Sequence, residues 1–82
     1  MRDLELLLKQ HMIEVTLRHY SNVLEATNRD EEVNMKEALN YILLIKKADL
    51  ATLINYIVDG KFDDMAIHSE DIGPIIQHLT TL

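Results

Sequence analysis

The chain has 82 residues, a net charge of −6, no cysteine and 48% apolar residues. This apolar content excludes an intrinsically disordered chain, and the length allows one small core with little room for a deep active site. The acidic balance disfavours general binding to nucleic acids or to anionic membranes, because a negative surface repels phosphate groups.

The composition also bears on the cellular compartment. Small secreted domains often carry disulfides, so the absence of cysteine favours the reducing cytoplasm. No signal peptide is expected, because Glu5 and Lys9 interrupt the apolar residues near the N-terminus. The apolar run 42–45 is far too short to span a bilayer. We therefore expect a cytoplasmic protein that does not insert into membranes and forms one domain over residues 1–82.

The first predicted element is a long helix over roughly residues 3 to 26. Five residues recur on one face at 100° per residue and are expected to face the core: Leu6, Ile13, Leu17, Tyr20 and Leu24. A polar loop, 28–30, follows this helix. Asp30 is expected to be the N-cap of the next helix, and Glu31 and Glu32 suit the positive end of its dipole.

A second helix is expected over about residues 31 to 47. Its broad apolar face makes it the predicted central and most buried helix; this face contains Met35, Ala38, Leu39, Ile42, Leu43 and the stem of Lys46, widened by Leu44 and Ile45. Asp49 is predicted to cap a third helix, and Gly60 to end it in the left-handed conformation. The third helix should bury Leu50, Leu53, Ile54, Ile57 and Val58.

The C-terminal third of the chain predicts a connector and a last helix. The connector should pack on the core through a short turn that contains Phe62, Met65, Ala66 and Ile67. The last helix begins at Ser69 or at Gly73-Pro74, because proline is favoured at the first helical position. Its inward residues would be Ile72, Ile75, Ile76, Leu79 and Leu82. The predicted fold is therefore all-α, a compact bundle of four to five helices with a long N-terminal helix.

The acidic stretch DGKFDDMAIHSED (59–71) invites comparison with a calcium-binding loop. Counted from Asp59, an EF-hand would place Lys61 where position 3 needs an oxygen ligand, and Asp64 where position 6 needs glycine. No pair of histidines has the i, i+4 spacing of zinc-binding helices. We therefore interpret the stretch as an exposed connector and predict no metal and no cofactor.

Catalysis and DNA recognition are also weakly supported by the sequence. The only serines are Ser21 and Ser69, and the only glycines are Gly60 and Gly73, so neither a nucleophile elbow nor a phosphate-binding loop is present. A helix-turn-helix starting near Lys47 would have an acidic recognition helix, which would repel DNA. We predict a protein that is not an enzyme, has no catalytic residues and binds no nucleic acid.

A second apolar stripe lies on the opposite face of the first helix and is the candidate partner-binding site. It consists of Leu4, Leu8, His11, Val15 and His19, bordered by Leu7 and Met12. An outer helix of a small bundle needs only one apolar face. Two interpretations stay open: the first helix is central and packs on both sides, or the stripe binds a partner helix or forms a homodimer seam. The two histidines would make such a contact sensitive to pH.

The stretches HMIEVTLRHY (11–20) and NYILLIKKADL (40–50) resemble the small cytoplasmic antiholins of T-even bacteriophages, which delay host lysis. The resemblance implies a protein without catalysis that binds the cytoplasmic N-terminal segment of a holin, a small membrane protein, and stabilises the inhibited holin complex. It transfers no individual site residue. Two alternatives remain: a regulator that binds a sigma factor or RNA polymerase, and an immunity protein or antitoxin that neutralises a basic partner.

Overall fold

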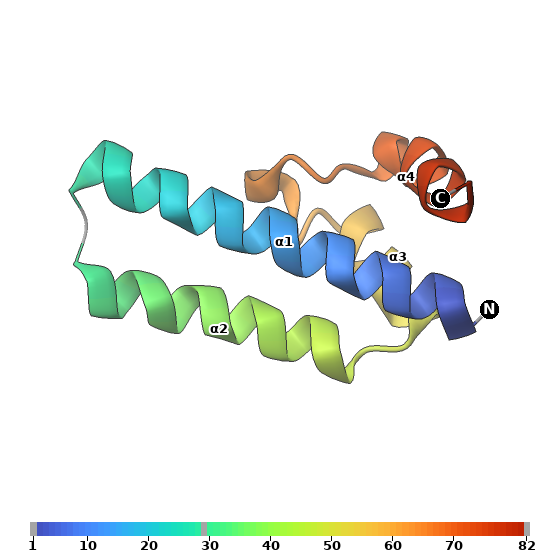
Figure 1. The fold of residues 1–82 in the computed structure, drawn as a ribbon, viewed down its shortest axis with the longest axis horizontal. Helices are drawn as coiled ribbons and strands as arrows, with labels where there is room; N and C mark the ends of the chain where they lie inside the picture. Colours follow the sequence, from blue (N-terminus) through green and yellow to red (C-terminus); the bar gives the residue numbers. More distant parts are fainter. Residues whose placement is uncertain (1, 29, 82) are drawn as a thin grey trace.

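The computed structural model describes residues 2–28 and 30–81, and the chain is all-α, as predicted (Figure 1). The helices are α1 (Arg2–Thr27), α2 (Glu31–Lys47), α3 (Leu50–Val58) and α4 (Ile72–Thr80). Two 3-10 turns, Asp63–Met65 and Ser69–Asp71, lie in the connector between α3 and α4. Ser69 and Pro74 do not start the last helix as predicted, because α4 begins at Ile72 and follows directly on the second of these turns.

Local capping explains why α2 and α3 begin and end where they do. Asp30 accepts a hydrogen bond from the Val33 N–H at 3.0 Å. Asp49 accepts one from the Thr52 N–H at 2.8 Å, and this bond holds the pKa of Asp49 below its ordinary value. Gly60 then ends α3 with φ 82°, a left-handed conformation that glycine adopts without strain.

Two side chains of α1 hold the turn between α2 and α3. Lys9 donates from Nζ to the carbonyl oxygen of Lys46 at 3.0 Å, which satisfies one of the last carbonyls of α2. The Leu50 N–H donates to Glu5 Oε1 at 2.9 Å, at the first residue of α3. Because both contacts come from one helix turn of α1, they fix the turn against the N-terminal half of that helix.

Two buried polar side chains fix the register of the helices. Asn34 donates from Nδ2 to the carbonyl oxygen of Tyr20 at 2.9 Å, and this bond joins the N-terminal end of α2 to α1. Thr16 is fully buried in α1 and donates back to the Met12 carbonyl at 2.7 Å. The same hydroxyl lies 3.7 Å from Met65 Sδ in the connector, so the contacts that Asn34 and Thr16 make with other elements disfavour a shifted packing.

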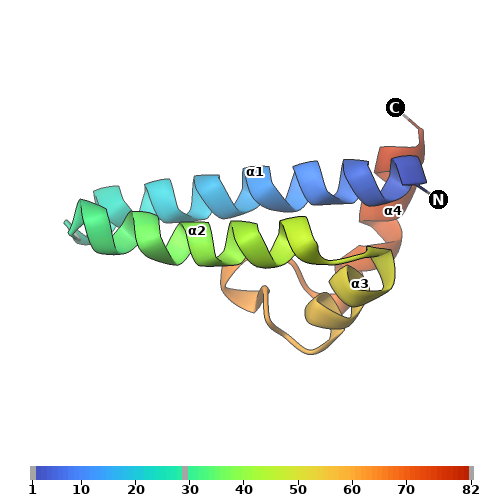
Figure 2. The same ribbon diagram turned by 90° about the horizontal axis from the view of Figure 1, so that it is seen from below.

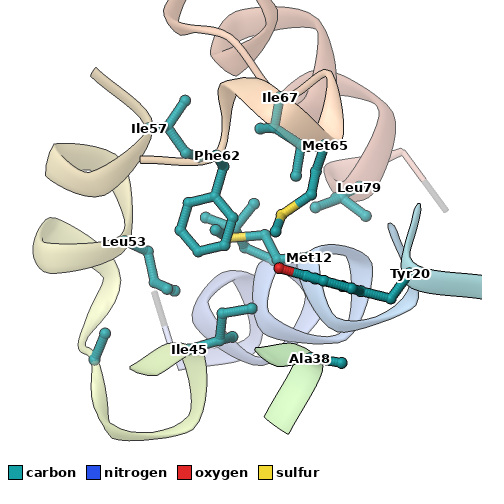
Figure 3. Packing of buried hydrophobic residues seen from close by; sticks show 12 residues of the cluster. Met12, Tyr20, Ala38, Ile45, Leu53, Ile57, Phe62, Met65, Ile67 and Leu79 are labelled. Carbon is teal, nitrogen blue, oxygen red and sulfur yellow. The ribbon is translucent and has the colours of Figure 1, made fainter. Parts of the chain in front are cut away.

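The core is assembled around Phe62, which comes from the connector and is completely buried (Figure 3). Its ring lies 5.5 Å from the ring of Tyr41 and 6.4 Å from that of Tyr56, measured between centroids. Buried residues from all four helices and the connector share this cluster: Leu8, Met12, Tyr20, Ala38, Ile45, Ala48, Leu53, Ile57, Met65, Ile67 and Leu79. The expected anchoring of the connector by Phe62, Met65 and Ile67 is confirmed, whereas Ala66 is exposed.

The central helix is α1, so the prediction that α2 is central was wrong. α1 contacts α2, α3, α4 and the first 3-10 turn, and its residues Leu8, Met12 and Thr16 are almost inaccessible to solvent. The candidate partner-binding stripe, for which packing within the fold was one of two open interpretations, has Leu8 in the core and Leu4 and Val15 packed against it. Leu6 and Leu17, predicted to face the core, are 56% and 51% exposed, while Tyr20 is buried as expected.

Helix α2 also buries a narrower face than its sequence predicts. Only Asn34, Ala38 and Ile45 are buried in it, and Met35, Leu39 and Leu43 are about half exposed. The buried residues of α2 form one narrow stripe on that helix. Burial of its whole broad apolar face would need neighbouring elements on two sides. Val58 in α3 is likewise exposed rather than inside, and Leu82 lies outside the described residues.

The arrangement has two layers. α1 and α2 form an antiparallel hairpin, and α3 with the connector packs on one side of it (Figure 2). α4 lies against α1 near the end of the hairpin where α1 begins (Figure 1). Within the described residues, no helix is long and apolar enough to cross a membrane.

We expect the Phe62→Ala substitution to lower the free energy of unfolding by about 3–5 kcal/mol, because it leaves a cavity at the centre of the core. This is a large part of the stability of a small domain, so the midpoint of urea denaturation should fall steeply. Val58→Ala, in the exposed position nearby in sequence, should change the same free energy by less than about 0.5 kcal/mol. Equal effects of the two substitutions would contradict the central position of Phe62.

Candidate functional site

An apolar hollow lies between α1 and α4. It has a volume of about 370 Å³ and opens to solvent. Its walls consist of His11 and Val15 from α1, Ala66 and Ile67 from the connector, and Asp71, Pro74, Ile75 and His78 from the last turn and α4. We call this hollow the α1–α4 groove. A smaller hollow of about 220 Å³ continues it past His11 and His78 toward Leu7, Gln10, Glu14 and Leu79.

The local sequence explains why the groove stays open. Ala66 adopts a left-handed conformation with φ 58°, and this reverses the connector directly after the buried Met65. The chain then continues to Asp71, whose Oδ2 accepts a hydrogen bond from the His68 N–H at 3.0 Å. α4 follows directly on the second 3-10 turn, and its Leu79 is buried in the core.

The candidate partner-binding stripe of α1 is split by the fold. Leu8 is 2% exposed and belongs to the core, so it has no surface to offer a partner. Leu4 packs against the same buried cluster. His19 stacks edge-on against the ring of Tyr20, at 5.2 Å between centroids, away from the groove lining. Only His11 and Val15 contribute to the α1–α4 groove.

Sequence reasoning missed the opposite wall of the groove. Pro74, Ile75 and His78 come from α4, more than fifty residues after His11 along the chain. The i, i+3 and i, i+4 spacing of these three residues places them on one face of a helix, but it does not indicate which helix they meet. That pairing depends on how the connector folds.

The surroundings of His11 in the groove shift its pKa. The pKa of His11 lies below its ordinary value of 6.5, first because burial disfavours the charged ring. The charges of His78 and Arg18 lower this pKa further, while Glu14 acts in the opposite direction. Near neutral pH the uncharged ring of His11 is therefore favoured, which suits an apolar wall.

A second hollow, on the other side of the connector, is polar. It has a volume of about 420 Å³ and is lined by Ile57, Val58, Asp59, Gly60, Asp63, His68, Ser69 and Glu70. Asp63 Oδ1 lies 3.2 Å from His68 Nδ1, so the fold brings together a carboxylate and an imidazole of the acidic stretch. Their hydrogen bond does not extend to Ser69, whose hydroxyl has no partner among the described residues.

The acidic stretch thus has two sides with different chemistry. Ala66 and Ile67 line the apolar α1–α4 groove, whereas Asp59, Asp63 and Glu70 line the polar hollow. Asp71 stands at the boundary, in the lining of the groove itself. Among residues 2–28 and 30–81, no group of three or more His, Asp or Glu side chains could hold a metal ion. The α1–α4 groove is thus apolar with one carboxylate, Asp71, in its lining, and Asp59, Asp63 and Glu70 line the polar hollow instead.

Comparison with known proteins adds no relative: no family model, curated protein or solved structure matches the chain.

We expect the stability of the protein to fall as the pH drops below about 6.5. Because the pKa of His11 is lowered on folding, the unfolded chain binds the proton more readily, and the stability is fully present above the unfolded value of 6.5. His11→Gln should remove this part of the pH dependence, which urea denaturation between about pH 5 and 7.5 measures. His19→Gln serves as the control, and an unchanged slope in His11→Gln would contradict the assignment.

Proposed function

We propose that this chain is a non-enzymatic regulatory protein that binds a segment of another protein in the α1–α4 groove. The observation that carries the proposal is an apolar groove with the carboxylate of Asp71 in its lining, in a chain of net charge −6. Grooves of this kind accept the apolar face of an amphipathic segment. Electrostatic complementarity then selects for a partner with positive charge on its other face.

The partner segment is basic and lies next to a membrane. Apolar side chains of the segment would contact Val15, Pro74 and Ile75, and its basic side chains would face Asp71 and the acidic connector. Cytoplasmic segments close to a membrane span carry an excess of Lys and Arg, so they supply this combination. A short cytoplasmic segment of a small membrane protein is therefore the partner class that fits best.

The resemblance to T-even antiholins points to the same class of partner. We propose that the chain acts in the cytoplasm as an antiholin-like protein, binding the cytoplasmic N-terminal segment of a holin and delaying lysis. Support for this proposal comes from the groove and from its charge. A sigma factor, RNA polymerase or a basic toxin would also present positive surfaces, so binding must be tested with the holin segment itself.

We expect a fluorescently labelled peptide of the holin cytoplasmic segment to bind the protein, with an affinity that falls as salt is added. His78→Lys should weaken binding on the order of tenfold, because a fixed positive charge in the groove repels a basic segment. Gln77→Lys is the matched control, since it adds the same charge to an exposed position of α4 outside the groove lining. Fluorescence anisotropy measures both affinities.

The same pair of variants tests the biological role. Bacteria that express the holin should lyse later when they also express this protein, and the delay should be lost with His78→Lys and kept with Gln77→Lys. Peptide binding that is insensitive to His78→Lys would overturn the groove as the site. A protein that neither binds the holin peptide nor delays lysis would overturn the antiholin-like function.

Neutralising exposed carboxylates of the connector should weaken the same complex without unfolding the protein. We expect Asp64→Asn combined with Glu70→Gln to reduce peptide affinity and flatten its salt dependence, because both carboxylates are exposed on the connector. The midpoint of urea denaturation should change little. Glu25→Gln combined with Glu31→Gln, at the far end of the hairpin, is the control for the net charge. An unchanged affinity after Asp64→Asn combined with Glu70→Gln would exclude the connector from binding.

A further inference from the structure

Most of the exposed large apolar side chains among the described residues belong to the α1–α2 hairpin, and none of them lines the α1–α4 groove. Leu6 and Leu17 in α1, and Met35, Leu39 and Leu43 in α2, are each 49–59% exposed. The residues that these two helices bury face α3 and the connector, and no described element covers α2 on the hairpin's other side (Figure 2). Clustered exposed leucines in a small protein indicate an interface.

The spacing of these residues is that of a helical bundle. In α2, Glu32, Met35, Leu39, Ile42 and Lys46 follow one another in alternating steps of three and four residues. In α1, Leu6, Ile13, Leu17 and Leu24 are separated by seven, four and seven residues. Such heptad spacing forms the seam between helices of a bundle. Leu17 and Met35 line one shallow hollow between α1 and α2, so the two seams adjoin.

The charges of α2 are complementary to those of a second, antiparallel copy of α2. Around Leu39 as the centre, Glu32 lies seven residues before and Lys46 seven residues after. Met35 and Leu43 lie four residues on either side of the same centre. A two-fold axis at Leu39 would thus pair Met35 with Leu43 of the partner subunit and place opposite charges together at both ends. The self-complementary pattern is the requirement for an isologous dimer.

We propose that two copies of this chain associate through the exposed hairpin face, with the two α2 helices antiparallel and Leu39 at the two-fold axis. The two hairpins then form a four-helix bundle whose seams are the apolar stripes left uncovered in one chain. The α1–α4 groove stays outside this interface. The dimer is therefore independent of the proposed partner binding, and either can fail alone.

Analytical ultracentrifugation over a range of protein concentrations tests the proposal. The wild type should show a monomer–dimer equilibrium, and Leu39→Lys should raise the dissociation constant at least tenfold, because it opposes two like charges at the axis. Val58→Lys is the matched control, since Val58 is 57% exposed and lies in α3, outside the face. Circular dichroism should show both variants folded. A wild type that stays monomeric up to about 0.5 mM would overturn the proposal.

The orientation of the two copies has its own test. Glu32→Lys and Lys46→Glu should each weaken the dimer, and the double variant should restore it, because the pairing of positions 32 and 46 across the axis survives the exchange. The chain has no cysteine, so Leu39→Cys should form a covalent dimer on mild oxidation, whereas Val58→Cys should not. Absence of rescue in the double variant, together with no selective cross-linking at position 39, would overturn the antiparallel arrangement.

Discussion

The fold depends on the burial of Phe62, the single phenylalanine of the chain, beneath the helical hairpin. In a core made mostly of aliphatic residues and methionines, this ring is completely buried, and the rings of Tyr41 and Tyr56 pack beside it. Because Phe62 belongs to the connector and not to a helix, its burial draws residues 59–71 onto α1. This contact decides on which side of the hairpin the second layer forms.

The functional surfaces follow from that choice of side. With the connector held under α1, α4 can only reach α1 from the flank, and the space between them becomes the α1–α4 groove. The acidic residues of the connector then remain at the surface, because Phe62, Met65 and Ile67 occupy its inward positions. The apolar residues that line the groove and the acidic residues that face solvent thus lie on two sides of one anchored segment.

The same choice leaves the opposite side of the hairpin uncovered. Met35, Leu39 and Leu43 have helical spacing suited to burial, yet within one chain they contact solvent over about half of their area. Two short elements, α3 and α4, do not suffice to cover both sides of a hairpin whose first helix has 26 residues. A second copy would provide the missing neighbour while leaving the groove open, so the two surfaces can serve different partners.

The sequence by itself determined the helices, because their boundaries depend on local chemistry. Asp30 and Asp49 cap helices through contacts three residues away, and Gly60 ends one through its own backbone freedom. The anchoring of the connector was also predictable, since Phe62, Met65 and Ile67 are the apolar residues of an acidic stretch. These features involve interactions within a few residues, which helical periodicity and capping preferences describe well.

Only the tertiary structure decided which apolar stripe faces inward. α1 carries two apolar stripes, and the periodicity of each one fits the same helical pattern. Leu17 was therefore predicted to face the core but is exposed, and Leu8, a candidate partner-binding residue, is buried. The contacts of Thr16 with Met65 and of Asn34 with Tyr20, and the burial of Phe62, select one packing over the other. The groove could not be predicted from the sequence for the same reason. His11 and His78 line it together only after α4 has packed against α1, and more than fifty residues separate them along the chain.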